Sequence, residues 1–100
     1  MNYYSPRQYR QNKEAVRFLV LNSFDLAAKV PGALLVQAKN LVAGDQVFLP
    51  NGTRREPLSW TVSQPVQTTR CADGLDYVRV YHGQDNNCFE ANDRLCVVRP

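Results

Sequence analysis

Long apolar runs are absent from this 100-residue chain, and no stretch approaches the roughly 18 apolar residues that a membrane-spanning helix needs. The opening residues, MNYYSPRQYR, are not followed by an apolar block with a small-residue cleavage site, so we expect no signal peptide. Three cysteines cannot all pair within one chain, and without export they are expected to remain free thiols. The sequence therefore predicts a cytoplasmic protein with no membrane partner.

Residues that carry chemistry are also scarce. Structural zinc sites take their ligands in close pairs, whereas the candidates in this chain are unevenly spaced: Cys71, His82, Cys88 and Cys96. Nucleophilic catalysis needs a base beside the nucleophile, and nothing in the sequence requires His82 to lie beside Cys71 or Cys88. The glycines are isolated in turns and form no phosphate-binding loop. We predict no catalytic residue, no metal site and no cofactor, and hence a protein that is not an enzyme.

What the chain does contain is the composition of an ordinary globular domain, with 44% hydrophobic and 21% charged residues. Its length suits one domain with one modest core. The charge is unevenly distributed, because residues 1–30 hold five basic and two acidic side chains, whereas residues 71–100 hold three basic and five acidic ones. This asymmetry predicts a surface with two electrical faces.

Residues 1–31 are expected to form an N-terminal helical segment. Ser5-Pro6 is a typical helix start, and Pro31-Gly32 is a typical stop. Between them, apolar residues recur on one helical face: Tyr9, Val16, Val20, Phe24 and Ala27. Residues 16–21 are apolar on nearly every helical side and rich in branched residues, so a strand there is the alternative. A helix over about 6–29 is favoured.

Residues 33–100 carry short apolar runs separated by turns. The expected strands are Leu34–Gln37, Val47–Leu49, Trp60–Val62, Val66–Arg70, Tyr77–Tyr81, Cys88–Ala91 and Leu95–Val98. Asn51-Gly52 is a strong hairpin signal, and residues 83–87 are expected to be a loop. Strands of this length and spacing predict a small barrel or a rolled sheet, and a small antiparallel barrel is favoured. The fold class is thus α+β, with the helical segment packed on the barrel in a single domain. The expected core is Val20, Phe24, Leu35, Leu41, Val47, Leu49, Val62, Val66, Val78, Val80, Leu95 and Val97.

Residues 36–47 follow the pattern V-x-A-x-x-L-x-x-G-D-x-V. Leu41 is expected to pack inward, Gly44 to supply a positive φ in the turn, and Asp45 to cap it. The stretch resembles the opening of small SH3-like barrels, including modules carried by bacteriophages. The resemblance implies an SH3-like barrel and, by analogy, a partner-binding module encoded by a phage or another mobile element.

Tyrosine and arginine gather on one face of the expected strand 77–81. This face and the Asn-Gly hairpin tip make up the candidate site for a protein partner: Tyr77, Arg79, Tyr81, Arg54 and Arg55. Aromatic residues mixed with arginine are typical of hot spots in protein–protein interfaces. The favoured function is therefore non-catalytic binding of a protein, as an adaptor, an inhibitor or an assembly subunit, with the oligomeric state left open.

The alternative function is nucleic-acid binding by the N-terminal arm. That arm interleaves stacking faces with charges that attract phosphate: Tyr3, Tyr4, Arg7, Tyr9, Arg10, Lys13 and Arg17. The net charge of the whole chain is only +3, and its last third is acidic. This balance favours a helix that packs on the barrel with its arginines solvated, and the resemblance to phage-carried modules favours a protein partner.

Overall fold

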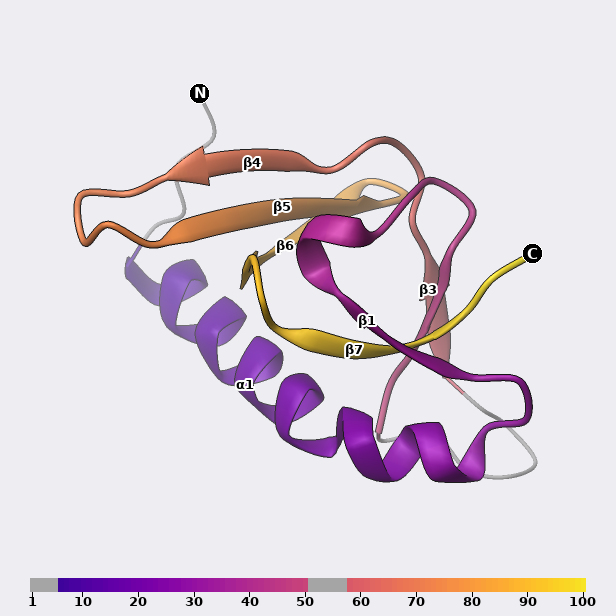
Figure 1. The fold of residues 1–100 in the computed structure, drawn as a ribbon. Helices are drawn as coiled ribbons and strands as arrows, with labels where there is room; N and C mark the ends of the chain where they lie inside the picture. Colours follow the sequence, from indigo (N-terminus) through magenta and orange to yellow (C-terminus); the bar gives the residue numbers. More distant parts are fainter. Residues whose placement is uncertain (1–5, 51–57) are drawn as a thin grey trace.

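The computed structural model of the protein describes residues 6–50 and 58–100, with side chains described from Lys13 onward. Within these ranges one α-helix comes first in the chain, and the strands and a short 3-10 turn follow it (Figure 1). They are α1 (Pro6–Lys29), β1 (Leu34–Gln37), the 3-10 turn η1 (Ala38–Asn40), β2 (Gln46–Phe48), β3 (Ser59–Thr61), β4 (Gln67–Arg70), β5 (Asp76–His82), β6 (Asp85–Glu90) and β7 (Arg94–Val98). All seven expected strands are present, with ends that differ by a few residues.

The described strands form two antiparallel sheets, in the orders β1-β7-β2-β3 and β4-β5-β6. The α+β class is therefore confirmed, whereas a closed barrel is not, because strand pairing in the described residues does not join the two sheets. A backbone hydrogen bond links them instead: the N–H of Ser63, just after β3, donates to the carbonyl of Tyr81 in β5 at 2.9 Å. Figure 1 shows α1 running along both sheets, and it packs mainly on β7, with further contacts to β6 and β1.

Helix α1 is continuous from Pro6 to Lys29, so the alternative of a strand at residues 16–21 is wrong. From Lys13 onward, where its side chains are described, the buried positions of α1 are Leu19 and Ser23. The Ser23 hydroxyl donates a 2.7 Å hydrogen bond to the Leu19 carbonyl, which satisfies it within the helix. Phe24, which was expected in the core, is 72% exposed. The polar residue Ser23 lies on the buried face of the helix, so the positions of the apolar residues do not mark that face correctly. They predict a buried face that is turned around the helix axis toward Phe24.

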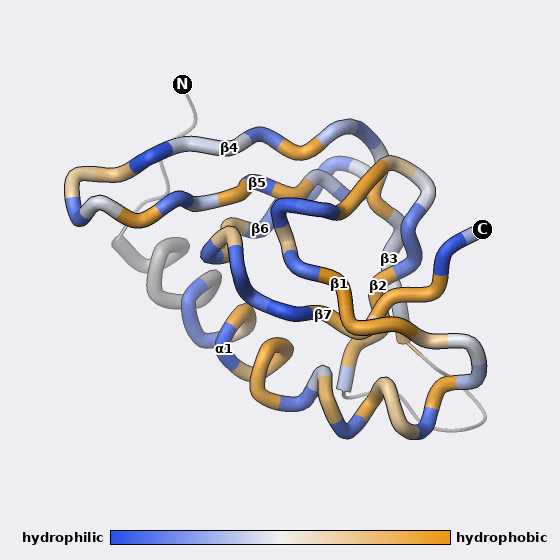
Figure 2. The backbone as a smooth tube through the Cα atoms, in the orientation of Figure 1, coloured by the Kyte–Doolittle hydropathy of each residue, from blue (hydrophilic) through white to orange (hydrophobic). Residues whose placement is uncertain are grey.

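The core lies between the sheets and α1. Seven of the expected residues are buried there: Leu41, Val47, Val62, Val78, Val80, Leu95 and Val97. Three more pack against it partly buried: Val20, Leu49 and Val66. In β1 the buried side chain is Val36, while Leu35 is only half-buried, because neighbouring strand residues point to opposite faces. Figure 2 shows hydrophobic residues concentrated in β1, β2 and β7, whereas β4 is mostly hydrophilic.

The segment 83–87, expected to be a loop, is largely strand. His82 pairs with Asp85 across the sheet, so the connection between β5 and β6 is the two-residue turn Gly83-Gln84. Gly83 has a φ of 68°, a conformation that glycine adopts without a steric penalty. The asparagines that suggested a loop lie in β6, where Asn86 and Asn87 pair with β5.

The turn after η1 has the predicted geometry and one unforeseen contact. Gly44 has a φ of 97°, and Asp45 Oδ2 accepts a 3.0 Å hydrogen bond from the Val42 N–H. Asp45 is fully buried, and its Oδ1 lies 3.3 Å from Nε of Arg99 in an ion pair. Arg99 also donates to the Asn40 carbonyl at 3.1 Å. The C-terminal arginine thus compensates the buried charge of the turn.

Candidate functional site

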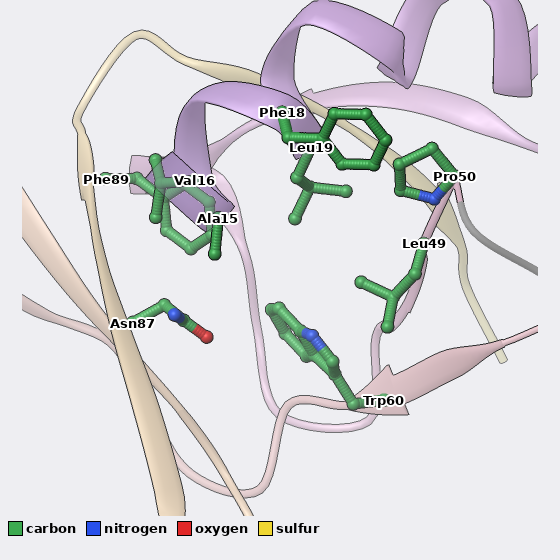
Figure 3. Close-up of a pocket in the computed structure, with 9 residues that line it drawn as sticks. All are labelled: Ala15, Val16, Phe18, Leu19, Leu49, Pro50, Trp60, Asn87 and Phe89. Carbon is green, nitrogen blue, oxygen red and sulfur yellow. The ribbon is translucent and has the colours of Figure 1, made fainter. Parts of the chain in front are cut away.

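An apolar cleft of about 240 Å³ lies between α1 and the strands (Figure 3). Its lining comes from four separate parts of the chain: Ala15, Val16, Phe18, Leu19, Leu49, Pro50, Trp60, Asn87 and Phe89. Figure 3 shows the Trp60 indole projecting into the cleft from the strand side, opposite the residues of α1. The polar groups among these lining residues are the Asn87 amide and the indole N–H of Trp60. The surroundings suit an apolar group that makes few hydrogen bonds.

The Trp60 side chain, which forms one wall of the cleft, is positioned by contacts with His82. The Trp60 and His82 rings stack with centroids 4.1 Å apart and planes 14° from parallel. His82 Nε2 in turn donates a 2.6 Å hydrogen bond to Oδ1 of Asn87, which itself lines the cleft. Because Trp60 stacks on His82 and His82 is hydrogen-bonded to Asn87, the Trp60 side chain loses little conformational entropy when a ligand binds. The cleft is therefore preformed.

The outward side of α1 carries a second apolar feature, which we call the outward row and define as Phe18, Leu21 and Phe24. These side chains are 54%, 69% and 72% exposed. Leu21 is two residues from both Leu19 and Ser23, so it lies about 160° around the helix from each buried position. Helices that are apolar on every side are normally covered. Because Phe18 also lines the cleft, the row and the cleft meet at that residue.

The β5 face predicted to bind a partner has the expected alternation, with Val78 and Val80 buried and the intervening residues half-buried on the other side. Its tyrosine hydroxyls are already engaged within the chain. Tyr77 donates to Oδ2 of Asp73 at 2.9 Å, and Tyr81 donates to Oε1 of Gln67 at 3.1 Å. The Asp73 carboxylate accepts this hydrogen bond, which stabilises the protonated phenol and raises the pKa of Tyr77 to about 12. Arg79 lies between the two tyrosines and is half-buried.

Several predicted site residues lie outside the described part of the structure. These are Tyr3 and Tyr4 of the arm and Arg54 and Arg55 of the hairpin tip, together with the side chains of Arg7, Tyr9 and Arg10, whose backbone belongs to α1. Lys13 and Arg17 are described, and both are exposed on α1. The structure thus places the two described basic residues of the arm on the helix that carries the outward row.

The candidate cysteine–histidine pairs are not brought together. Cys88 pairs with Arg79 and shares its face of the sheet, whereas His82 is on the opposite face, where it stacks on Trp60. Cys71 lies beyond the far end of β5, roughly 20 Å along the strand from His82. Cys96 is fully buried, and this burial raises the pKa of its thiol. Among the described residues, no three His, Cys, Asp or Glu side chains are grouped closely enough to hold a metal ion.

The chain has no match among protein-family models, curated proteins or solved structures. In the described ranges, no helix has both the length and the apolar character needed to cross a bilayer. The cleft is the feature that reasoning from sequence missed, since its residues come from α1, the end of β2, β3 and β6. One feature of the sequence does point to the cleft. Residues 16–21 are apolar on nearly every side of the helix, as expected for a helix that contacts the core on one side and a ligand on another.

Proposed function

We propose that the protein is a non-catalytic binding module, and that a partner protein inserts an apolar side chain into the cleft beside Trp60. The single observation that carries this proposal is the preformed apolar cleft, whose Trp60 wall is held by His82 and Asn87. Interface hot spots are typically large side chains that enter well-packed, desolvated pockets of this kind.

The size of the cleft favours a protein partner over a small-molecule substrate. At about 240 Å³ it is smaller than the pockets of roughly 300–1,000 Å³ that take drug-sized ligands. Its lining offers few polar groups, the Asn87 amide and the Trp60 indole N–H, so most of the affinity for a partner must come from apolar contact. The predicted partner segment carries a bulky apolar anchor.

The finer fold assignment is part of the same proposal: an SH3-like module of the kind that phages carry. The support is the stretch 36–47, in which Val36, Ala38, Leu41 and Val47 are buried around the turn capped by Asp45. The β5 face with Tyr77, Arg79 and Tyr81, together with Arg54 and Arg55, stays a predicted secondary contact. Nucleic-acid binding by the N-terminal arm stays the alternative.

The test uses a displayed library of random peptides selected on the immobilised full-length protein. Trp60 is the only tryptophan in the chain, so its fluorescence reports directly on the cleft. We expect the selected peptides to share an aromatic or large aliphatic anchor and to change Trp60 emission. Ala15→Phe fills the cleft from an exposed position on α1 and is expected to weaken binding by about tenfold or more.

The matched control is Ala43→Phe, which adds the same side chain at an exposed turn position that does not line the cleft. It is expected to bind the peptides like the wild type. Peptides that bind both variants equally would refute the cleft as the site. Binding of mixed-sequence DNA or RNA that weakens steeply with salt and with Arg17→Ala would instead support the nucleic-acid alternative.

A further inference from the structure

The outward side of α1 is self-complementary about one residue, Leu21. Counting outward from Leu21, Phe18 and Phe24 lie three residues away in opposite directions, and Arg17 and Asp25 lie four residues away. All five of these residues are exposed. A large apolar side chain is thus flanked first by apolar side chains and then by charges of opposite sign.

This order has a specific consequence when two copies of the helix meet. In an antiparallel pair with a two-fold axis at Leu21, residues equally distant from Leu21 in opposite directions lie at the same level. Arg17 then lies level with Asp25 of the second copy, and Phe18 lies level with Phe24 of the second copy. Each contact occurs twice, as a symmetric interface requires.

The next charged residues along the helix are Lys13 and Glu14, eight and seven residues before Leu21, and Lys29, eight residues after it in the last turn of α1. All three are exposed. The antiparallel arrangement brings Glu14 within one residue of the level of Lys29, which favours association, and it places Lys13 level with Lys29, which opposes association. A parallel pair would instead place Arg17 against Arg17 and Asp25 against Asp25, and like charges at an interface oppose association. The charges therefore select the antiparallel orientation.

We propose that the protein forms a two-fold symmetric dimer in which the α1 helices pack antiparallel through the outward row, with Leu21 at the axis and Arg17 paired with Asp25 of the second copy. An unrelated partner would not need this symmetric order of side chains, whereas a second copy does. The dimer goes beyond the proposed cleft function, because Phe18 is the one member of the outward row that also lines the cleft, and Leu49, Pro50 and Trp60 of the cleft lie outside α1.

Analytical ultracentrifugation of the full-length protein over a range of concentrations tests the dimer. We expect a monomer–dimer equilibrium whose dissociation constant rises by about tenfold or more in Leu21→Glu. The matched control is Val42→Glu, which makes the same kind of change at a residue that is 55% exposed in the turn before β2. It is expected to dimerise like the wild type. Leu21→Gln is the second variant if the introduced charge disturbs the helix, as judged by circular dichroism.

A charge exchange tests the orientation. Arg17→Asp alone and Asp25→Arg alone each place like charges level with each other, so each is expected to weaken the dimer. The double variant R17D/D25R restores two opposite pairs and is expected to dimerise close to the wild-type strength.

Three results would overturn the proposal: a wild-type protein that stays monomeric throughout, a dimer that Leu21→Glu does not weaken, or a double variant no better than the single ones. The peptide assay with Ala15→Phe is a separate measurement, so failure of the dimer and failure of the cleft are distinguishable.

Discussion

The outer face of β5 and the outward side of α1 both present large side chains to solvent, but they differ in what those side chains contact. On β5 the hydroxyls of Tyr77 and Tyr81 donate to Asp73 and Gln67 of the same chain. On α1 the outward row is apolar, and its members are 54–72% exposed. The strand face resembles a binding site in composition, whereas the helix side has the exposed surface that a binding site needs.

The difference follows from the physics of burial. A hydrogen bond already made within the chain must be kept or replaced when a partner arrives, so it adds little net free energy. Apolar area removed from water stabilises a complex by about 25 cal/mol for each Å². Exposed apolar side chains next to a preformed cleft therefore have more to gain from association than tyrosines whose hydroxyls are engaged. The three predictions that follow compare the helix with the strand, from the largest expected effect to the smallest.

Truncation of a leucine to alanine should destabilise the protein strongly on the buried side of α1 and hardly at all on its outward side. Leu19 is 5% exposed in the core, so Leu19→Ala is expected to lower the free energy of unfolding by about 3 kcal/mol. Leu21→Ala removes the same atoms from an exposed position and is expected to change it by less than about 0.5 kcal/mol. Urea unfolding of both variants, at concentrations where the protein is monomeric, measures the contrast. Equal losses would mean that Leu21 is packed within one chain.

On the strand, removal of one hydroxyl should have a small but measurable effect. Tyr81→Phe deletes the donor to Gln67 at the exposed β4–β5 surface, and is expected to cost about 0.5 kcal/mol of unfolding free energy. Urea unfolding of Tyr81→Phe, of Gln67→Ala and of the double variant completes a double-mutant cycle. A coupling energy of zero would show that the hydroxyl is not engaged and would weaken the contrast between the two faces.

The smallest effect concerns the titration of Tyr77. Its pKa is raised to about 12 because the protonated phenol donates a hydrogen bond to Asp73, whereas an unfolded tyrosine titrates near 10. A pKa raised in the folded state means that this contribution to stability is fully present below about pH 10 and is lost as pH rises through about 12. The ultraviolet absorbance of phenolate, taken as the difference between the wild type and Tyr77→Phe, isolates this group. Asp73→Asn is expected to lower the midpoint, and an unchanged midpoint would contradict the contact.

Much of the fold could be predicted from sequence. The helix bounds follow from Ser5-Pro6 and Pro31-Gly32, and each expected strand is present, because these signals are local. The errors arise where a polar residue sits in an apolar face or where tertiary context decides. Ser23 is polar but buried, because its hydroxyl donates a hydrogen bond to the Leu19 carbonyl. The apolar pattern therefore predicts the wrong buried face of α1 and places the exposed Phe24 in the core.

The candidate site was less predictable than the fold. The β5 residues Tyr77 and Tyr81 lie in an expected strand and show the expected alternation. Whether their hydroxyls form hydrogen bonds depends on Asp73 and Gln67, and only the folded structure brings these partners close. Phe89, which is buried in the core and lines the cleft, follows asparagines that suggested a loop. The cleft joins parts of the chain more than 70 residues apart, from Ala15 to Phe89, and no local pattern encodes that distance.

The most direct test of the central claim, that association uses α1 rather than β5, is a dilution series followed by amide chemical shifts of the isotopically labelled full-length protein. Dilution from millimolar to micromolar protein dissociates the complex and reports each backbone position separately. We predict that the concentration-dependent shifts fall on residues 14–28 of α1 and leave β4 and β5 unchanged. Shifts centred on Tyr77 and Tyr81, with α1 unaffected, would contradict the account.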